Sequence, residues 1–100
     1  MITAAEILRD AAKTFEERNQ TYGENYRKVG AIWKILYPEG VRLETEYDHL
    51  VYHLFDWAIG KITRASAGPF PITHVDSIHD AVVYLAMVEM IMRNANEQEK

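Results

Sequence analysis

Two cations on one predicted helix could hold a phosphate group. Lys61 lies on the border of the apolar stripe of that helix, and Arg64 follows one turn later. A lysine in this position either extends toward water or meets an anion, because an unpaired buried charge is costly. A salt bridge to Asp76, Asp80 or Glu89 would satisfy this lysine inside the chain. A ligand phosphate would satisfy it from outside, with Arg64 as a second donor.

Three residues of a later segment could face the same ligand. Asp76, Asp80 and Tyr84 are spaced i, i+4 and i+8, so a helix places them on one face. Asp76 could cap that helix or contact a ligand. Asp80 comes where the helix is expected to be buried, so it needs a ribose hydroxyl, a metal ion or Lys61 as a partner. Tyr84 could stack on a ligand or pack in the core.

Further candidate ligand contacts come from aromatic residues and from loops. Arg18 and Tyr22 lie beside a predicted loop, in which Gly23 is expected to supply a turn with positive φ. Trp57 offers a stacking surface, and Phe70 lies on a long loop that could close over a ligand. Such loops can also be simple connections, although long ones are more often functional.

A histidine-bearing face of the third predicted helix is a candidate metal site. His49 and His53 are four residues apart, and Asp56 follows three residues later. This spacing is compatible with metal ligands. It equally describes a solvated helix face, and no third segment obviously supplies more ligands. We therefore assign no metal ligand and no catalytic residue, and leave the role of this face open.

The elements that must position these residues are four helices. Thr3 with Glu6, and Thr45 with Asp48, match capping boxes at two helix starts. Apolar residues then recur with a helical period, and Gly30 inside the second helix suggests a close helix crossing, since it costs roughly 1 kcal/mol against alanine. Loops and a solvated tail are expected at 19–23, 38–40, 66–75 and 94–100. The predicted helices span about 3–18, 25–37, 45–65 and 76–93.

The last helix carries an unusual apolar surface. Between Ala81 and Met92 its only strongly polar residue is Glu89, which lies roughly opposite Asp80 and needs a basic partner on another helix or another chain. A helix that is apolar all round must be covered on all sides. We therefore expect a homo-oligomer in which this helix, with Phe55 and Ile59, faces another subunit.

Composition sets the class of protein. The chain has 100 residues, 48% of them apolar, which predicts one compact all-α domain over 1–100. The chain has no cysteine, which suits a reducing cytoplasm and removes thiol chemistry. The net charge of −4 argues against a broad nucleic-acid surface. No signal peptide and no membrane-spanning run is visible, so we expect a cytoplasmic protein without a membrane partner.

Several of these residues together resemble a known family. The pattern resembles small phage-encoded helical domains of uncharacterised function, and is similar to nucleotide-modification-associated helical domains. The residues that carry the resemblance are Arg18-x-x-x-Tyr22-Gly23, Trp33, Lys61-x-x-Arg64 and Asp76-Ser77-x-x-Asp80-x-x-x-Tyr84.

More distantly, the chain resembles the all-α NTP pyrophosphohydrolases of the MazG and dimeric dUTPase kind. Those enzymes hold magnesium with a Glu-Glu-x-x-Glu motif on one helix and acidic residues on the next. Here Glu16-Glu17 is followed by Gln20 where the third glutamate is expected, and the third helix offers Asp48 and Asp56. The resemblance implies a helical oligomer with a nucleotide-sized pocket.

The favoured hypothesis is a protein that sequesters a small nucleotide, such as a host defence signal in a phage-infected cell, without a cofactor. The first alternative is a magnesium-dependent NTP pyrophosphohydrolase that uses Asp76, Asp80 and a glutamate from another helix. The second alternative is a protein-interaction module that binds no small ligand. A cleft into which Lys61, Arg64 and Asp80 converge would argue against that module.

Overall fold

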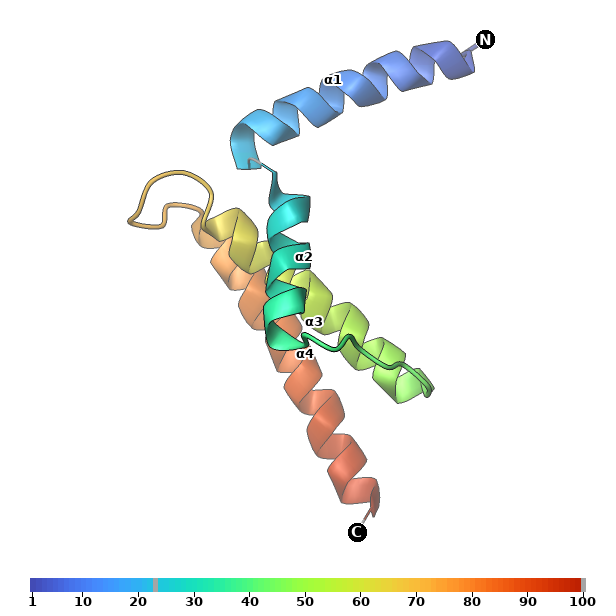
Figure 1. Ribbon diagram of the computed structural model, residues 1–100, viewed down its shortest axis with the longest axis vertical. Helices are drawn as coiled ribbons and strands as arrows, with labels where there is room; N and C mark the ends of the chain where they lie inside the picture. The colour runs from blue at the N-terminus through green and yellow to red at the C-terminus, as the bar shows by residue number, and fades with distance from the viewer. Residues whose placement is uncertain (23, 100) are drawn as a thin grey trace.

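The computed structural model describes residues 1–22 and 24–99, except for the side chains of Tyr22 and 97–99. Four helices account for most of the described chain, and these residues contain no strand. The all-α prediction is confirmed (Figure 1). None of the described helices is long and apolar enough to cross a bilayer. The helices are α1 (Ala4–Tyr22), α2 (Asn25–Leu36), α3 (Glu46–Ala65) and α4 (Val75–Glu99).

Both predicted capping boxes are present. At the start of α1, the Thr3 amide donates to a carboxylate oxygen of Glu6 at 3.1 Å, and the Glu6 amide donates to the Thr3 hydroxyl at 3.2 Å. At the start of α3, the Asp48 amide donates to the Thr45 hydroxyl at 3.0 Å, and the Thr45 amide donates to Asp48 Oδ2 at 3.1 Å. Each box satisfies amides that have no partner inside the helix.

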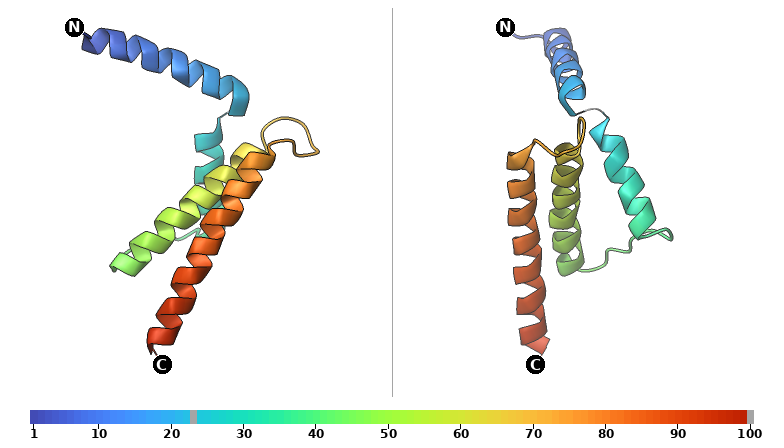
Figure 2. Two further views of the ribbon diagram at one scale, coloured as in Figure 1. Left: turned by 180° about the vertical axis from the view of Figure 1, so that it is seen from behind. Right: turned by 90° about the vertical axis from the view of Figure 1, so that its left-hand side faces the viewer.

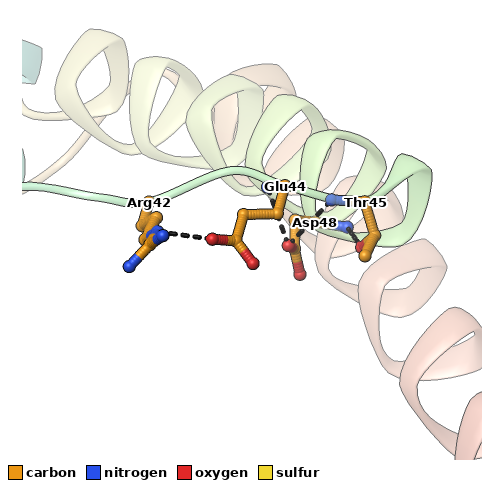
Figure 3. A network of polar contacts seen from close by, with 4 residues as sticks. All are labelled: Arg42, Glu44, Thr45 and Asp48. Carbon is orange, nitrogen blue, oxygen red and sulfur yellow. Dashed lines mark hydrogen bonds and ion pairs between the residues drawn. The ribbon is translucent and has the colours of Figure 1, made fainter.

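The box of α3 belongs to a larger polar network (Figure 3). The Glu44 amide also donates to Asp48 Oδ2, at 3.0 Å, and the Glu44 carboxylate forms an ion pair with Arg42 at 2.5 Å. The backbone hydrogen bonds from Glu44 and then Thr45 lower the pKa of Asp48, because they stabilise the charged carboxylate.

Two helices extend further than the sequence predicted. Helix α1 continues through 19–22, where a loop was expected, and the Thr21 hydroxyl donates to the Glu17 carbonyl at 3.2 Å. Helix α4 continues through 94–99, where a frayed tail was expected. Both predictions were wrong because these segments are polar but contain no proline or glycine to end a helix. The turn expected at Gly23 lies outside the described residues.

The core lies between α3 and α4, which run antiparallel and side by side (Figure 2). Small side chains are prominent in their interface and allow the two helices to approach closely. The connection between them contains Gly68, whose φ of 86° favours glycine. The buried apolar residues are Leu54, Ala58, Ile59, Ala65 and Ala67 from α3 and its end, and Ala81 and Val88 from α4.

Helix α2 packs on the other side of α3 through Trp33. The indole stacks on Tyr52 at 4.8 Å between ring centroids and meets Phe55 edge to face at 5.6 Å. Its Nε1 donates to Asp56 Oδ1 at 2.7 Å, which gives the part-buried indole the acceptor that it needs. Ile59, four residues after Phe55, is only 4% exposed. The prediction that Ile59 faces another subunit was therefore wrong, while the same prediction for Phe55, which is half-buried beside Trp33, stays open.

A second correction concerns Gly30 of α2. A Cβ placed there would meet nothing within 4 Å, so this glycine allows no close helix crossing in the chain. The helix ends at Leu36, close to the predicted stop. The Lys34 ammonium donates to the Pro38 carbonyl at 2.6 Å, and Gly40 takes a φ of 93° in the turn that follows.

The compact shape predicted from the sequence is not observed. Helix α1 projects from one end of the body formed by α2, α3 and α4 (Figures 1 and 2). The radius of gyration is 17.2 Å, against about 13 Å for a compact chain of this length. Helices α2 and α4 occupy two sides of α3, and α1 extends beyond them.

Candidate functional site

A hollow of about 270 Å³ opens where α2, α3 and α4 meet. We call it the cationic cleft. It brings together Trp57, Lys61 and Arg64 from α3 with Tyr84 from α4, all of them residues singled out in the sequence. The other residues that line the cleft are Asn25, Val29, Asp56 and Gly60.

Lys61 is held at this cleft by an ion pair. Its ammonium lies 3.1 Å from Asp80 Oδ2, and the two side chains are 24% and 45% exposed. The internal salt bridge considered from the sequence is therefore present, and it brings Asp80 beside the cleft. An ammonium has three donors, so one carboxylate oxygen leaves it with protons for another anion. Because the pair is partly exposed, it contributes at most about 1 kcal/mol to stability.

The aromatic wall of the cleft is partly open. Trp57 is 48% exposed and meets Tyr84 edge to face at 5.2 Å between ring centroids. His53 lies on the other side of the indole, at 4.1 Å. These contacts fix the orientation of Trp57 and leave part of its surface available for stacking.

Gly60 widens the cleft. It lies on α3 one residue before Lys61, and a Cβ at this position would meet nothing within 4 Å. The Thr63 hydroxyl lies within hydrogen-bond distance of the Gly60 carbonyl, at 2.9 Å, and of Asn25 Oδ1, and these two acceptors share its single proton. The bond to Asn25 joins the start of α2 to the end of α3 and so fixes the width of the cleft at this end.

A second hollow of about 370 Å³ adjoins the first. Asn25 and Arg64 line both, so they form the boundary between them. Arg18 contributes a further cation from the end of α1, next to Phe15. Arg18 and Arg64, which are 46 positions apart in the sequence, thus line one hollow.

Two predicted site residues lie elsewhere, and the side-chain position of a third is not described. Phe70 is 88% exposed on the loop between α3 and α4 and lines neither hollow. Asp76 lies inside the first turn of α4, because this helix begins one residue earlier than expected, at Val75. A carboxylate there interacts favourably with the helix dipole. The side chain of Tyr22 is outside the described part of the chain.

The residues of the histidine-bearing face each contact a different neighbour. His49 Nδ1 lies 2.8 Å from the Thr45 carbonyl oxygen, His53 packs on Trp57, and Asp56 accepts from Trp33. Among the side chains that the structure describes, no three histidine or acidic groups lie closely enough together to hold a metal ion.

Glu89 also differs from its prediction. Its carboxylate pairs with Arg93 Nε at 3.1 Å, one turn further along the same helix, and both side chains are largely exposed. The expected basic partner on another helix or chain is therefore not needed, because α4 supplies one itself.

Sequence reasoning did not include Asn25, Val29 or Gly60 among the predicted site residues, although all three line the cleft. Nothing in their spacing indicates that the start of α2 lies beside the end of α3. The tertiary contact between Thr63 and Asn25 decides this.

Comparison of the chain with protein-family models, with curated proteins and with solved structures found no match.

Proposed function

We propose that this chain binds a small nucleotide in the cationic cleft and holds it without cleaving it. The observation that carries the proposal is the convergence of Lys61 and Arg64 with Trp57 and Tyr84 around one hollow. Cations recognise phosphate through charge-assisted hydrogen bonds, and aromatic rings stack on a base. The resemblance stated from the sequence supports the same class of ligand, including a host defence signal in the cytoplasm of a phage-infected cell.

The size of the site supports a nucleotide rather than a lone phosphate ion. Small-molecule pockets commonly measure about 300–1,000 Å³. The cleft of about 270 Å³ adjoins the hollow of about 370 Å³ across Arg64. A ligand that stacks on Trp57 and extends past Lys61 would reach Arg64 and then Arg18 with its phosphates.

The contacts made by the acidic residues favour holding over cleavage. Asp80 is paired with Lys61, and Asp56 accepts from Trp33. A pyrophosphohydrolase needs several carboxylates that converge on metal ions. Among the described residues that line the two hollows, Asp56 is the acidic one, so the several carboxylates that such an enzyme needs do not converge there.

The proposal includes a homo-oligomer that covers the outer face of α4. Val82, Val83 and Met90 are 57%, 44% and 53% exposed on this face. A surface patch of this kind is typical of an interaction site. Light scattering at micromolar concentration is expected to give a mass above that of one 11.6 kDa chain.

Binding is tested by calorimetry with cyclic and linear nucleotides, after mass spectrometry of any molecule that the purified protein retains. We expect Lys61→Ala to weaken binding by about 1–3 kcal/mol, the usual loss for a charge-assisted contact. Lys28→Ala is the matched control, since Lys28 is an exposed lysine of α2 that lines neither hollow. Equal affinities of the two variants would show that Lys61 has a structural role only.

Cleavage is tested by chromatography of the nucleotide after incubation with stoichiometric protein and magnesium. We expect the nucleotide to be recovered unaltered. Multiple-turnover formation of a monophosphate and pyrophosphate would replace the sequestration proposal with the enzyme alternative. If no nucleotide binds, the protein-interaction alternative remains.

A further inference from the structure

Helix α1 carries an apolar stripe that the rest of the chain leaves uncovered. Ile7, Leu8 and Phe15 are 59%, 69% and 56% exposed. With Ala4 and Ala11 they recur at intervals of three and four residues, so they share one face of the helix. The N-terminal half of α1 projects away from the body of the molecule (Figures 1 and 2).

The sequence nevertheless specifies α1 as a helix built for packing. It has a complete capping box, and no glycine or proline interrupts its 19 residues. Its charged residues alternate in sign on the opposite face, which suits water. An isolated helix of this length is only marginally stable in water, so most of its stability must come from packing of the apolar face.

The surface area of the whole chain indicates how much is left uncovered. The accessible surface is 8,104 Å². A compact monomer of the same mass exposes about 5,800 Å². The excess of roughly 2,300 Å² is well above the 800 Å² or so that each partner buries in a standard interface. An excess of this size is typical of a chain that completes its fold with another subunit.

We infer that the N-terminal part of this apolar stripe, with Ile7 and Leu8, packs on the outer face of α4 in a second copy of this chain. Both faces are apolar, and the 25 residues of α4 are long enough to receive the 19 of α1. A two-fold axis makes the contact reciprocal, so that each copy gives its α1 and receives the other. One type of contact then covers both exposed faces. This inference rests on the proposed homo-oligomer but not on nucleotide binding.

The exchange also affects the site. Phe15 and Arg18 of α1 line the second hollow together with Arg64. An assembly that holds α1 in place therefore holds one wall of that hollow as well.

The test compares two charge substitutions in α1 by sedimentation velocity of the full chain over a range of concentrations. Leu8→Glu places a charge on the stripe, and Lys13→Glu places the same side chain on the opposite face. We expect Leu8→Glu to raise the dissociation constant of the assembly about tenfold or more, because the contact would bury an unpaired charge. Lys13→Glu should leave the dissociation constant nearly unchanged.

A second measurement shows whether the contact is between chains. Amide hydrogen exchange is followed for residues 4–15 at low and high concentrations of the unmodified protein. Protection that rises with concentration supports the inference. Protection that is equal at concentrations below and above the dissociation constant found by sedimentation would overturn the inference.

The partner face is identified with single cysteines, since the chain has none of its own. A mixture of Leu8→Cys and Val83→Cys chains should form mixed disulfides in preference to Leu8→Cys dimers. The reverse preference would overturn the pairing of α1 with α4.

Failure of this inference is distinguishable from failure of the proposed oligomer. If Val82→Glu disrupts the assembly and Leu8→Glu does not, the α4 interface is supported and the role of α1 is overturned. A wild-type chain that sediments as a monomer would overturn both. Neither result bears on nucleotide affinity, which calorimetry measures separately.

Discussion

Helices α1 and α3 begin with the same capping motif, but their packing in the molecule differs. Thr3 with Glu6, and Thr45 with Asp48, form equivalent capping boxes. Both helices are amphipathic and close to 20 residues long. Yet α3 contacts α2 on one side and α4 on the other, while α1 projects from the body (Figure 1).

The difference teaches that a capped amphipathic pattern specifies a helix and its apolar face, but not the surface that this face meets. The partners of α3 directly precede and follow it in the chain, and Trp33 and Tyr84 attach to it from either side. The largest expected effects on stability therefore fall in α3.

Truncation of one leucine in each helix tests the comparison most strongly. Leu54 is 4% exposed, so Leu54→Ala should lower the free energy of unfolding by about 2–5 kcal/mol, through lost burial and a residual cavity. Leu8 is 69% exposed, so Leu8→Ala should cost less than about 0.5 kcal/mol in dilute protein. Urea denaturation followed by circular dichroism measures both.

Repeating the denaturation at high protein concentration sharpens this result. If a second copy covers α1, the loss of unfolding free energy caused by Leu8→Ala should grow with protein concentration. The loss caused by Leu54→Ala should stay the same. A large, concentration-independent cost at Leu8 would show that α1 belongs to the folded core of its own chain.

Removal of the caps is expected to have an intermediate effect. Thr45→Ala should cost about 1 kcal/mol of global stability, the usual loss for an N-cap threonine. Thr3→Ala removes the same contacts from α1, and should lower the protection of its first amides with little change in the cooperative unfolding transition. Hydrogen exchange and thermal melts together distinguish the two. Equal losses of melting temperature would contradict the proposed independence of α1.

The smallest expected effect is a change in stability with pH that depends on Asp48. The pKa of Asp48 is lowered in the folded protein because its carboxylate accepts backbone amides from Glu44 and Thr45. A lowered folded-state pKa adds stability above the unfolded-state pKa, and this stability is lost as the pH falls through the folded-state pKa. Asp48→Asn should therefore destabilise at neutral pH, and the difference from wild type should shrink in acid. A difference that is constant from neutral to strongly acidic pH would mean that the carboxylate charge plays no part.

Much of the candidate site was predictable as residue types on helical faces. The period placed Trp57, Lys61 and Arg64 along α3, and the spacing of Asp80 and Tyr84 placed these two on one face of α4. The same reasoning included Phe70 and Asp76, which line neither hollow. A position in the sequence does not determine the direction of a loop or the residue at which a helix begins, so the sequence cannot decide which of these residues line a hollow.

The sequence alone determined the four helices, the two capping boxes and the positions of the glycine- and proline-containing breaks. These depend on hydrogen bonds and side-chain spacing within a few residues. Only the tertiary structure decided that Asp80 is the partner of Lys61, that Asn25 and Arg64 lie between two hollows, and that α1 finds no place in the body of its own chain. Those outcomes depend on contacts between residues far apart in sequence, where several pairings satisfy the same local pattern and the packing of whole helices selects one of them.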